Sequence, residues 1–366
     1  MAIDSKIRSI IKALGYIKID DMMREVLSIN PSSYYRSQTS IGTDGDFITA
    51  PEISQLFGET IGFWLISKWQ QLGCPKEFAL IELGPGMGIL MRDLMRVVKL
   101  VPEFTQAVKI FLYEINNNFI KKQEDNLSFT SSKVIWINNL NDLPTIPCII
   151  ISNEFFDALP IKQYIKIRQT WYEAVIICDP IDSRLKLDKI ELNKALTQQL
   201  NIDHKNAHDG AILEESAEAL EIIRKITAHL RKVTGVCLVI DYGYNIEPAE
   251  RNRNQYNSTL QAIKNHQYQP IFESLGKSDL SAHVDFNALR NAVLQKGIKN
   301  IVISSQRDFL VNWGIVIRQQ LLKSTSSLED AGILDAQLHR LIAKEQMGKI
   351  FKVMEYSYFR QIKSQL

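Results

Sequence analysis

Short apolar runs alternate along the chain with longer segments in which an apolar residue recurs at every third or fourth position. Runs of the first kind predict strands, and segments of the second kind predict amphipathic helices. Seven runs predict strands at residues 78–83, 109–115, 133–137, 147–152, 235–242, 300–305 and 349–356. Because helix-length segments lie between them, the pattern predicts a mainly parallel α/β sheet rather than a β-sandwich.

Helices are predicted at residues 89–99, 117–124, 213–232 and 284–294. Two regions depart from the alternation of strands and helices. Residues 1–71 have a mostly helical pattern, interrupted by an extended Pro/Ser-rich break and by a glycine-rich loop. A hairpin of residues 162–167 and 171–178 is predicted directly after the fourth strand.

Composition limits the possible classes of protein. The chain has 366 residues, 45% apolar and 23% charged, which is enough for two domains or one enlarged domain. Its net charge is +2 without a long block of either sign, so nucleic acid is not an expected partner. No apolar run approaches the ~18 residues of a membrane span, and residues 1–21 lack the features of a signal or transit peptide. We expect no membrane insertion and a protein that stays in the compartment where it is made.

Metal binding is not expected either. The four cysteines are too far apart in sequence to form a Cys-x-x-Cys pair. His204 and His208 lie in a polar stretch that offers no third ligand.

The first predicted strand leads into a glycine-rich turn. Gly84, Pro85, Gly86 and Gly88 lie in this turn, and the next predicted helix begins near Ile89. Glycine lets the backbone approach a ligand closely, and a helix N-terminus offers free N–H groups. The turn therefore indicates a site for a polar cofactor, with a tight turn that binds no ligand as the alternative.

The spacing does not fit the dinucleotide-binding fingerprint, whose third glycine would replace Ile89. Instead, Glu114 ends the second predicted strand 28 residues after Gly86. This arrangement resembles the S-adenosylmethionine site of class I methyltransferases, in which a carboxylate at this place binds the ribose hydroxyls. By the same resemblance Asn139 could reach the adenine, although it is equally a candidate turn former. Glu82, just before the turn, is a further cofactor-binding candidate.

Polar residues follow the fourth predicted strand. Asn153, Glu154 and Asp157 begin at its carboxyl end, where open α/β sheets place their active sites. Glu154 and Asp157 are three residues apart, so both carboxylates could face one substrate. In a second option Asn153 contacts the methionine part of the cofactor and Glu154 is the main substrate ligand. In a purely structural interpretation the two carboxylates cap a turn.

A polar loop at residues 42–54 leads into a helix predicted at residues 53–69. Its glycines allow movement, and Asp46, Thr49 and Glu52 supply polar side chains. We interpret the loop as a lid over the cofactor and part of the substrate groove. A simple helix entry is the alternative.

Three isolated residues are further candidates for the substrate site. Asp241, near the end of the fifth strand, could orient the substrate or form a turn. His266 and His283 could act as an acid or base near the pocket. Each histidine could equally be a structural hydrogen-bonding residue.

Several motifs together resemble one family, the MidA-like S-adenosylmethionine-dependent methyltransferases. The matching stretches are residues 45–55 with 57–59, 82–86 with Gly88, 153–160 with Gln163, 241–244, 259–260 with His266, and 279–280 with 283–286. The glycine turn departs from the family at Met87 and Ile89, where Arg and Thr are usual, which leaves the backbone cradle intact. The resemblance implies an α/β fold with a class I (Rossmann-like) seven-strand methyltransferase core.

The resemblance also implies a domain organisation. The core is expected at residues 75–366, with insertions after strands 4 and 5 at about 161–210 and 245–282. An N-terminal helical cap is expected at residues 1–74, and the loop at 42–54 is its lid.

The resemblance implies S-adenosyl-L-methionine as methyl donor and arginine on a partner protein as acceptor. Glu154 and Asp157 together could then hold the cationic, forked guanidinium and accept its released proton. Mitochondrial members of the family act in respiratory complex I assembly, so a complex I subunit is an expected substrate. The expected location is the cytoplasm for a bacterial protein and the mitochondrial matrix for a eukaryotic one. The alternative function is a non-catalytic assembly factor that binds S-adenosylmethionine for stability. Glu154 and Asp157 favour the enzyme, because a scaffold does not need paired carboxylates.

Overall fold

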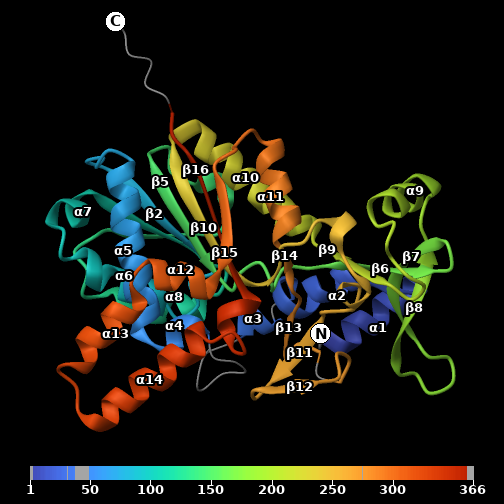
Figure 1. Cartoon of the computed structure of the whole chain (residues 1–366). Helices are drawn as coiled ribbons and strands as arrows, with labels where there is room; N and C mark the ends of the chain where they lie inside the picture. Colours follow the sequence, from blue (N-terminus) through green and yellow to red (C-terminus); the bar gives the residue numbers. More distant parts are fainter. Residues whose placement is uncertain (1–2, 31, 38–48, 274, 361–366) are drawn as a thin grey trace, which may run out of the picture.

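The computed structural model describes residues 3–30, 32–37, 49–273 and 275–360. Its main sheet has the strand order β15-β16-β10-β5-β2-β3-β4, and the short β14 pairs beside β10 (Figure 1). In the described sheet β16 is antiparallel to both of its neighbours, β10 and β15. The other strand pairs of this sheet are parallel. Each of the seven runs predicted as strands overlaps one of these strands. Their bounds are β2 Phe78–Leu83, β3 Val108–Tyr113, β4 Val134–Ile137, β5 Cys148–Asn153, β10 Gly235–Tyr244, β14 Val284–Asp285, β15 Ile301–Ser305 and β16 Phe351–Tyr358.

Helices cover both faces of the main sheet (Figure 1). Successive side chains of a strand point to opposite faces, so Phe78 and Leu80 of β2 pack on one hydrophobic cluster and Ala79 and Ile81 on the other. This two-sided burial explains why the central strands are continuous apolar runs. The first face carries α5 (Gln55–Gln71), α6 (Ile89–Val98), α7 (Pro102–Ala107) and α8 (Asn117–Leu127), and the second α10 (Ala217–Val233) and α11 (Phe286–Gln295).

A second sheet lies beside the main one, with strand order β1-β7-β6-β9 and β8 paired to β7. It contains the predicted hairpin, which is therefore confirmed. A third sheet has the order β12-β11-β13. The elements are β1 Ile17–Lys18, β6 Lys162–Ile167, β7 Thr170–Cys178, β8 Leu185–Glu191, α9 Lys194–Asp203, β9 Ile212–Glu215, η3 Pro248–Glu250, η4 Arg253–Gln255, β11 Gln261–Lys264, β12 Gln267–Gln269 and β13 Asp279–Ser281.

The N-terminal residues contribute to two different hydrophobic clusters. The first part packs with β7 and β13, away from the main sheet, whereas α4 (Ala50–Ile53) and α5 pack on the main sheet itself. The helices of the first part are α1 Ile3–Leu14, α2 Ile19–Arg24, the π-helix η1 Glu25–Ile29 and α3 Tyr34–Ser37. The proposed division of the chain at residues 74 and 75 stays a prediction.

Two predicted helices begin later than expected. The segment predicted as a helix from residue 213 opens with β9, which pairs with β6, and α10 begins only at Ala217. Ser216 caps that helix by accepting a hydrogen bond from the Ala219 N–H at 3.1 Å. Similarly, residues 284–285 form β14 and Asp285 caps α11. In both cases strand pairing with a distant segment overrides the local helical pattern.

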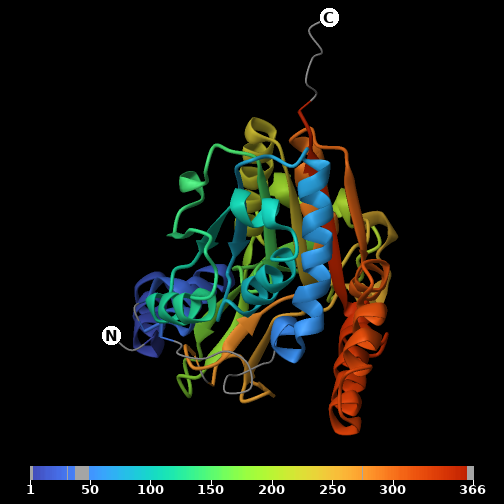
Figure 2. The same cartoon turned by 90° about the vertical axis from the view of Figure 1, so that its left-hand side faces the viewer.

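The sequence did not predict the helices between β15 and β16. These are α12 (Gln306–Asn312), α13 (Ile315–Lys323), α14 (Leu328–Ile342) and α15 (Met347–Ile350). Figure 2 shows the α13–α14 hairpin, in orange-red, projecting from the lower end of the molecule. No helix among the described residues is both long and apolar enough to cross a membrane.

Candidate active site

A cavity of about 470 Å³ opens at the carboxyl ends of β2, β3 and β5. Parallel α/β sheets place their ligand sites at this edge. Strand ends and the loops after them form much of the wall, and residues of η1, α3, α4, α6, α8 and α10 form the rest. The predicted site residues that line the cavity are Thr49, Glu52, Glu82, Gly84, Pro85, Gly86, Glu114, Asn153 and Glu154.

The glycine turn has the backbone conformation that its sequence suggested. Gly84, Gly86 and Gly88 all have positive φ, at +63°, +52° and +76°, a region that side chains with a Cβ rarely adopt. A Cβ at Gly84 would lie 2.8 Å from the Cδ2 atom of Phe155. Gly88 does not line the cavity but caps α6. The turn therefore brings backbone to the cavity wall at a place where a larger residue does not fit.

Gln123 joins the glycine turn to the acidic residue of the next strand. Its Nε2 donates to the Gly86 carbonyl oxygen at 2.7 Å and to Glu114 Oε2 at 3.0 Å, while its Oε1 accepts from Trp136 Nε1 at 2.7 Å. Glu114 Oε1 accepts from the N–H groups of the next two residues. Burial raises the pKa of Glu114, and these hydrogen bonds oppose that shift. Its carboxylate is thus held in one orientation at the cavity wall.

Glu82 is a buried carboxyl group that faces the same cavity. Its Oε2 has no hydrogen-bond partner among the residues that the structure describes. Burial, and secondly the charge of Glu114, raises its pKa to about 8. A cationic group of a ligand would satisfy this oxygen and favour the ionised form.

Asn153 and Glu154 form the cavity wall at the end of β5. Glu154 has φ of +51°, and its Oε1 accepts hydrogen bonds from the Ala50 N–H at 3.0 Å and from Asn153 Nδ2 at 3.1 Å. Burial raises the pKa of Glu154 to about 8, and the charge of Asp157 adds to the effect of burial. Asn153 is 9% exposed, and its Oδ1 lacks a hydrogen-bond partner in the described part of the chain.

Asp157 and Asp241 do not line the cavity. Asp241 is fully buried, and its Oδ2 accepts from the N–H groups of Phe156 and Asp157 at 3.0 and 3.2 Å. Burial raises the pKa of Asp157 to about 6, although the hydroxyl of Tyr242 hydrogen-bonds to its carboxylate and opposes the shift. Burial and the charge of Asp157 hold the pKa of Asp241 well above its usual range. Both carboxyl groups support the turn that presents Glu154.

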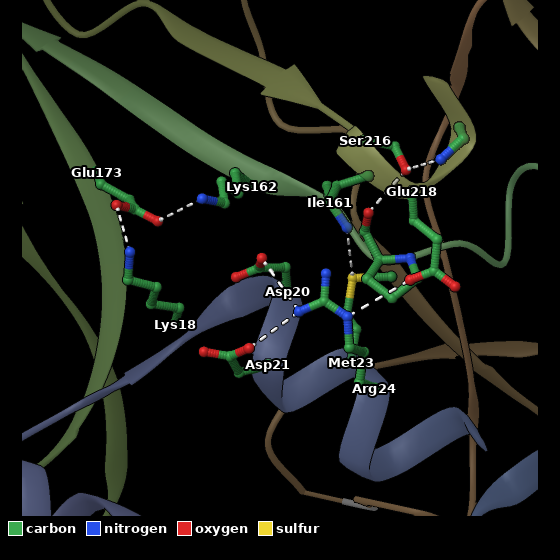
Figure 3. Close-up of polar contacts among 12 residues, drawn as sticks. Lys18, Asp20, Asp21, Met23, Arg24, Ile161, Lys162, Glu173, Ser216 and Glu218 are labelled. Atoms are coloured by element: carbon green, nitrogen blue, oxygen red, sulfur yellow. Dashed lines mark hydrogen bonds and ion pairs between the residues drawn. The ribbon is translucent and has the colours of Figure 1, made fainter. Parts of the chain in front are cut away.

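Polar contacts hold the N-terminal helix α2 against α10 and against the residue that precedes β6 (Figure 3). Arg24 of α2 forms ion pairs with Asp20 and Asp21 on its own helix and with Glu218 of α10, which lines the cavity. The sulfur of Met23 accepts from the Ile161 N–H at 3.5 Å. These contacts place η1 and α3 over the cavity.

Sequence reasoning missed two cavity residues of α3. The Tyr35 hydroxyl donates to Asp279 Oδ1 at 2.6 Å, and Arg36 Nε donates to the carbonyl oxygen of Ser28. The helix is too short to show a periodic pattern, so nothing in the sequence singled it out. Gln123 was missed because a helical glutamine is ordinarily a surface residue.

The predicted lid is described only from residue 49 onward, and Asp46 lies outside the described residues. Thr49 and Glu52 form a reciprocal capping box at the start of α4. Both side chains therefore have a structural role in addition to lining the cavity.

The remaining predicted site residues do not line the cavity. Asn139 caps the 3₁₀ helix η2 (Leu140–Asp142) by accepting from the Asn141 N–H at 2.9 Å, and it does not line the cavity. His266 is exposed in the turn between β11 and β12. His283 is partly buried with its ring 5.5 Å from that of Tyr242, and neither histidine lines the cavity. No group of three or more potential ligands in the described residues could hold a metal ion.

Other motif residues organise the neighbouring sheets. The buried Glu214 on β9 accepts hydrogen bonds from Gln163 Nε2 at 2.7 Å and from the Thr259 N–H at 2.9 Å. Asp285 pairs with the buried Arg251 at 2.6 Å. These residues fix loops around the site without contacting the cavity.

The charges of the cavity favour a cationic ligand. Five carboxyl groups line it, and Arg36 is the one basic residue of the described wall; the acids are Glu52, Glu82, Glu114, Glu154 and Glu218. A bound cation favours their ionised form. S-adenosylmethionine carries a sulfonium and an amino group, and its ribose hydroxyls suit Glu114. The unpartnered oxygen of Glu82 and the open backbone at Gly84 fit the same molecule. This fold and this site define an S-adenosylmethionine-dependent methyltransferase.

Comparison with known proteins identifies the family to which the chain belongs. It belongs to the family described as "Putative S-adenosyl-L-methionine-dependent methyltransferase", whose model matches residues 60–304. The chain is 32% identical to "Protein arginine methyltransferase NDUFAF7, mitochondrial" of Xenopus tropicalis, over 93% of this chain and 82% of that protein. The human protein of the same name is 30% identical over 87% of this chain and 74% of its own length.

Two solved structures from Burkholderia thailandensis have the same fold. One matches with a TM-score of 0.84 and 22% identity, over 97% of this chain and 91% of that chain. The other was crystallised with S-adenosyl-homocysteine and matches with a TM-score of 0.83 and 23% identity, over 97% of this chain and 92% of that chain. The match to the family model and to the curated relatives confirms the expected cofactor and enzyme class.

Proposed function

We propose that this protein transfers a methyl group from S-adenosylmethionine to an arginine side chain of a partner protein. The observation that carries the proposal is the pair Asn153 and Glu154 at the wall of the cofactor cavity. The pair offers a carboxyl group and an amide oxygen that has no hydrogen-bond partner among the described residues. Both groups are hydrogen-bond acceptors, as recognition of a guanidinium requires. The relatives named protein arginine methyltransferases support the same acceptor.

Glu154 and Asn153 have separate roles in this proposal. The cofactor supplies an electrophilic methyl group when bound. Asn153 Oδ1 accepts a hydrogen bond from a guanidinium N–H and fixes the plane of the group. Glu154 pairs with the cation, whose charge favours the carboxylate form. The nitrogen loses a proton on methylation, and the Glu154 carboxylate accepts it, because burial raises the pKa of this group and so favours its protonated form.

Asp157 receives an indirect role. We expected Glu154 and Asp157 to hold the guanidinium together, but only Glu154 lines the cavity. The charge of Asp157 raises the pKa of Glu154, and the N–H of Asp157 binds Asp241. We assign direct contact to Glu154 and positioning of its turn to Asp157 and Asp241.

The finer organisation of the chain is part of the proposal. We take the seven-strand path β15-β16-β10-β5-β2-β3-β4 as the class I core. The segments at about 161–210 and 245–282 are its insertions, and residues 1–74 with the loop at 42–54 are the cap and lid. Asn139 is retained as a candidate for the adenine end.

A subunit of respiratory complex I is the proposed acceptor, by resemblance to the family described above. The enzyme would then act in the cytoplasm of a bacterium or in the mitochondrial matrix of a eukaryote. The mitochondrial names of the relatives support the second case for their own organisms.

The test is methylation by the purified full-length protein in lysate from a strain that lacks it, with tritiated S-adenosylmethionine. We expect one or a few labelled proteins, and mass spectrometry should locate the methyl group on arginine. Label on another residue type would overturn the choice of acceptor. Binding of S-adenosylhomocysteine without any transfer would support the non-catalytic scaffold instead.

A further inference from the structure

A second hollow adjoins the cofactor cavity on the other side of α4. This groove, of about 560 Å³, lies between α4, the start of α6 and the α13–α14 hairpin. Pro51, Glu52, Met87 and Ile89 line both the groove and the cofactor cavity. The groove therefore lies directly beside the site at which we propose that arginine reacts.

The hairpin that forms the outer wall is held firmly to the main-sheet layer. Arg318 of α13 makes two hydrogen bonds with the carboxylate of Glu59 on α5, at 2.7 and 3.3 Å. Ser54 Oγ donates to Gln337 Oε1 of α14 at 2.7 Å. Lys323 and Asp335 join the two helices to each other at 2.7 Å. The groove is thus largely preformed, which reduces the entropy lost when a partner binds.

The lining of the groove suits a polypeptide that carries positive charge. Its wall combines apolar side chains, including Leu322, Ile333 and Leu334, with hydrogen-bonding groups such as Ser326. Glu52 and Asp330 contribute negative charge. The one basic residue of the described lining, Arg92, is paired with the buried Asp93 at 2.9 Å, so its charge is offset.

We propose that this groove binds the segment of the protein substrate that flanks the target arginine. The proposal rests on the proposed function and adds to it the surface that selects the acceptor protein. An extended segment in the groove would reach the reaction site past α4, where the two hollows share their wall. Apolar contacts with α14 and charge complementarity with Glu52 and Asp330 would supply the selectivity.

The hairpin offers a matched pair of variants. Ile333 lines the groove and is 50% exposed, whereas Leu321 is 58% exposed on the same hairpin and does not line it. Ile333→Lys should lower kcat/KM for the labelled acceptor protein at least tenfold, and Leu321→Lys should change it less than twofold. Both variants should bind S-adenosylhomocysteine with wild-type affinity by calorimetry, because neither residue contacts the cofactor cavity. Equal activity of the two variants, whether high or low, would overturn the proposal.

Photo-crosslinking identifies the occupant of the groove. The full-length chain carries p-benzoylphenylalanine at position 333 or, as control, at position 321, and is irradiated with S-adenosylhomocysteine in the same lysate. Position 333 should crosslink the protein that wild-type enzyme labels with tritium, and position 321 should not. Crosslinking to a second copy of this chain, or to proteins that are not methylated, would overturn the proposal. If wild-type enzyme labels no protein at all, the proposed function fails and this inference fails with it.

Discussion

The carboxylate of Glu154 accepts a hydrogen bond from the backbone N–H of Ala50 at 3.0 Å, across 104 positions of sequence. Ala50 begins α4, so this contact joins the helix between the two hollows to the end of β5. Glu154 also has φ of +51°, a conformation that costs energy for a residue other than glycine. A strained, partly buried carboxyl group at the cavity wall is the feature on which the proposed chemistry depends.

Glu154→Gln should reduce methyl transfer while leaving cofactor binding intact. Glutamine keeps an oxygen that can accept from Ala50, but it removes the charge that pairs with a guanidinium. Loss of a charge-assisted hydrogen bond costs about 1.5–3 kcal/mol, which corresponds to about a 10- to 150-fold lower kcat/KM. Glu218→Gln is the control, since Glu218 lines the same cavity but pairs with Arg24. A wild-type rate in Glu154→Gln would refute the assigned role.

Gln123→Met should weaken cofactor binding. The substitution keeps the length of the side chain but removes the donor to Glu114 and to the Gly86 carbonyl oxygen. We expect a loss of about 1.5–3 kcal/mol in the free energy of S-adenosylhomocysteine binding, measured by calorimetry. Asn126→Ala is the control, because Asn126 on the same helix donates to the Met87 carbonyl oxygen at 2.8 Å without contacting Glu114. Equal losses in the two variants would contradict a specific role for Gln123.

Gly84→Ala should abolish cofactor binding by displacing Phe155. The new Cβ would lie 2.8 Å from the ring, in addition to the cost of a positive φ. Gly73→Ala isolates that cost, since Gly73 has φ of +84° and a Cβ added there would meet nothing within 4 Å. In denaturant titrations Gly73→Ala should lose roughly 1–2 kcal/mol of unfolding free energy, and Gly84→Ala should lose more because its Cβ also displaces Phe155. Only Gly84→Ala should lose affinity for S-adenosylhomocysteine, and retained affinity would remove the turn from the site.

The contribution of Glu82 to the stability of the ligand-free protein should fall as pH rises from about 4.5 to about 8. Burial raises the pKa of Glu82 to about 8 in the folded state, above the ordinary value of 4.5 that applies when unfolded. The folded state therefore binds more protons in this window, and the stabilisation present below pH 4.5 is lost as pH passes the folded pKa.

Glu82→Gln should reduce this pH dependence, as measured by the free energy of unfolding in denaturant at pH 5 and pH 8. Glu154 contributes in the same direction, so part of the slope should remain. Glu103→Gln, which removes an exposed carboxylate on α7, is the control for the loss of one charge. If the free energy of unfolding of Glu82→Gln depended on pH as strongly as that of the wild type, the Glu82 carboxyl group would be ionised in the folded state.

The strands of the main sheet and the chemistry at their ends could be predicted from the order of residues. Strands buried on both faces are continuous apolar runs, which is why β2, β5 and β10 were recognisable. Glycine at positions 84 and 86 and carboxylates at strand ends are local features. Parallel strands bring their carboxyl ends to one edge, so the cofactor site followed from these features.

Which polar residues reach the cavity depends on contacts between distant parts of the chain. Glu154 and Asp157 are three residues apart, yet only the first lines the wall, because Asp241 binds the intervening turn from β10. Gln123 and Tyr35 acquire their roles from contacts across 37 and 244 positions. The α13–α14 hairpin exposes apolar residues such as Leu321 and Leu328, which obscures a helical pattern in the sequence. The periodicity of apolar residues in the sequence predicts which face of a helix or strand a residue lies on. Packing between distant segments decides which residues that face contacts.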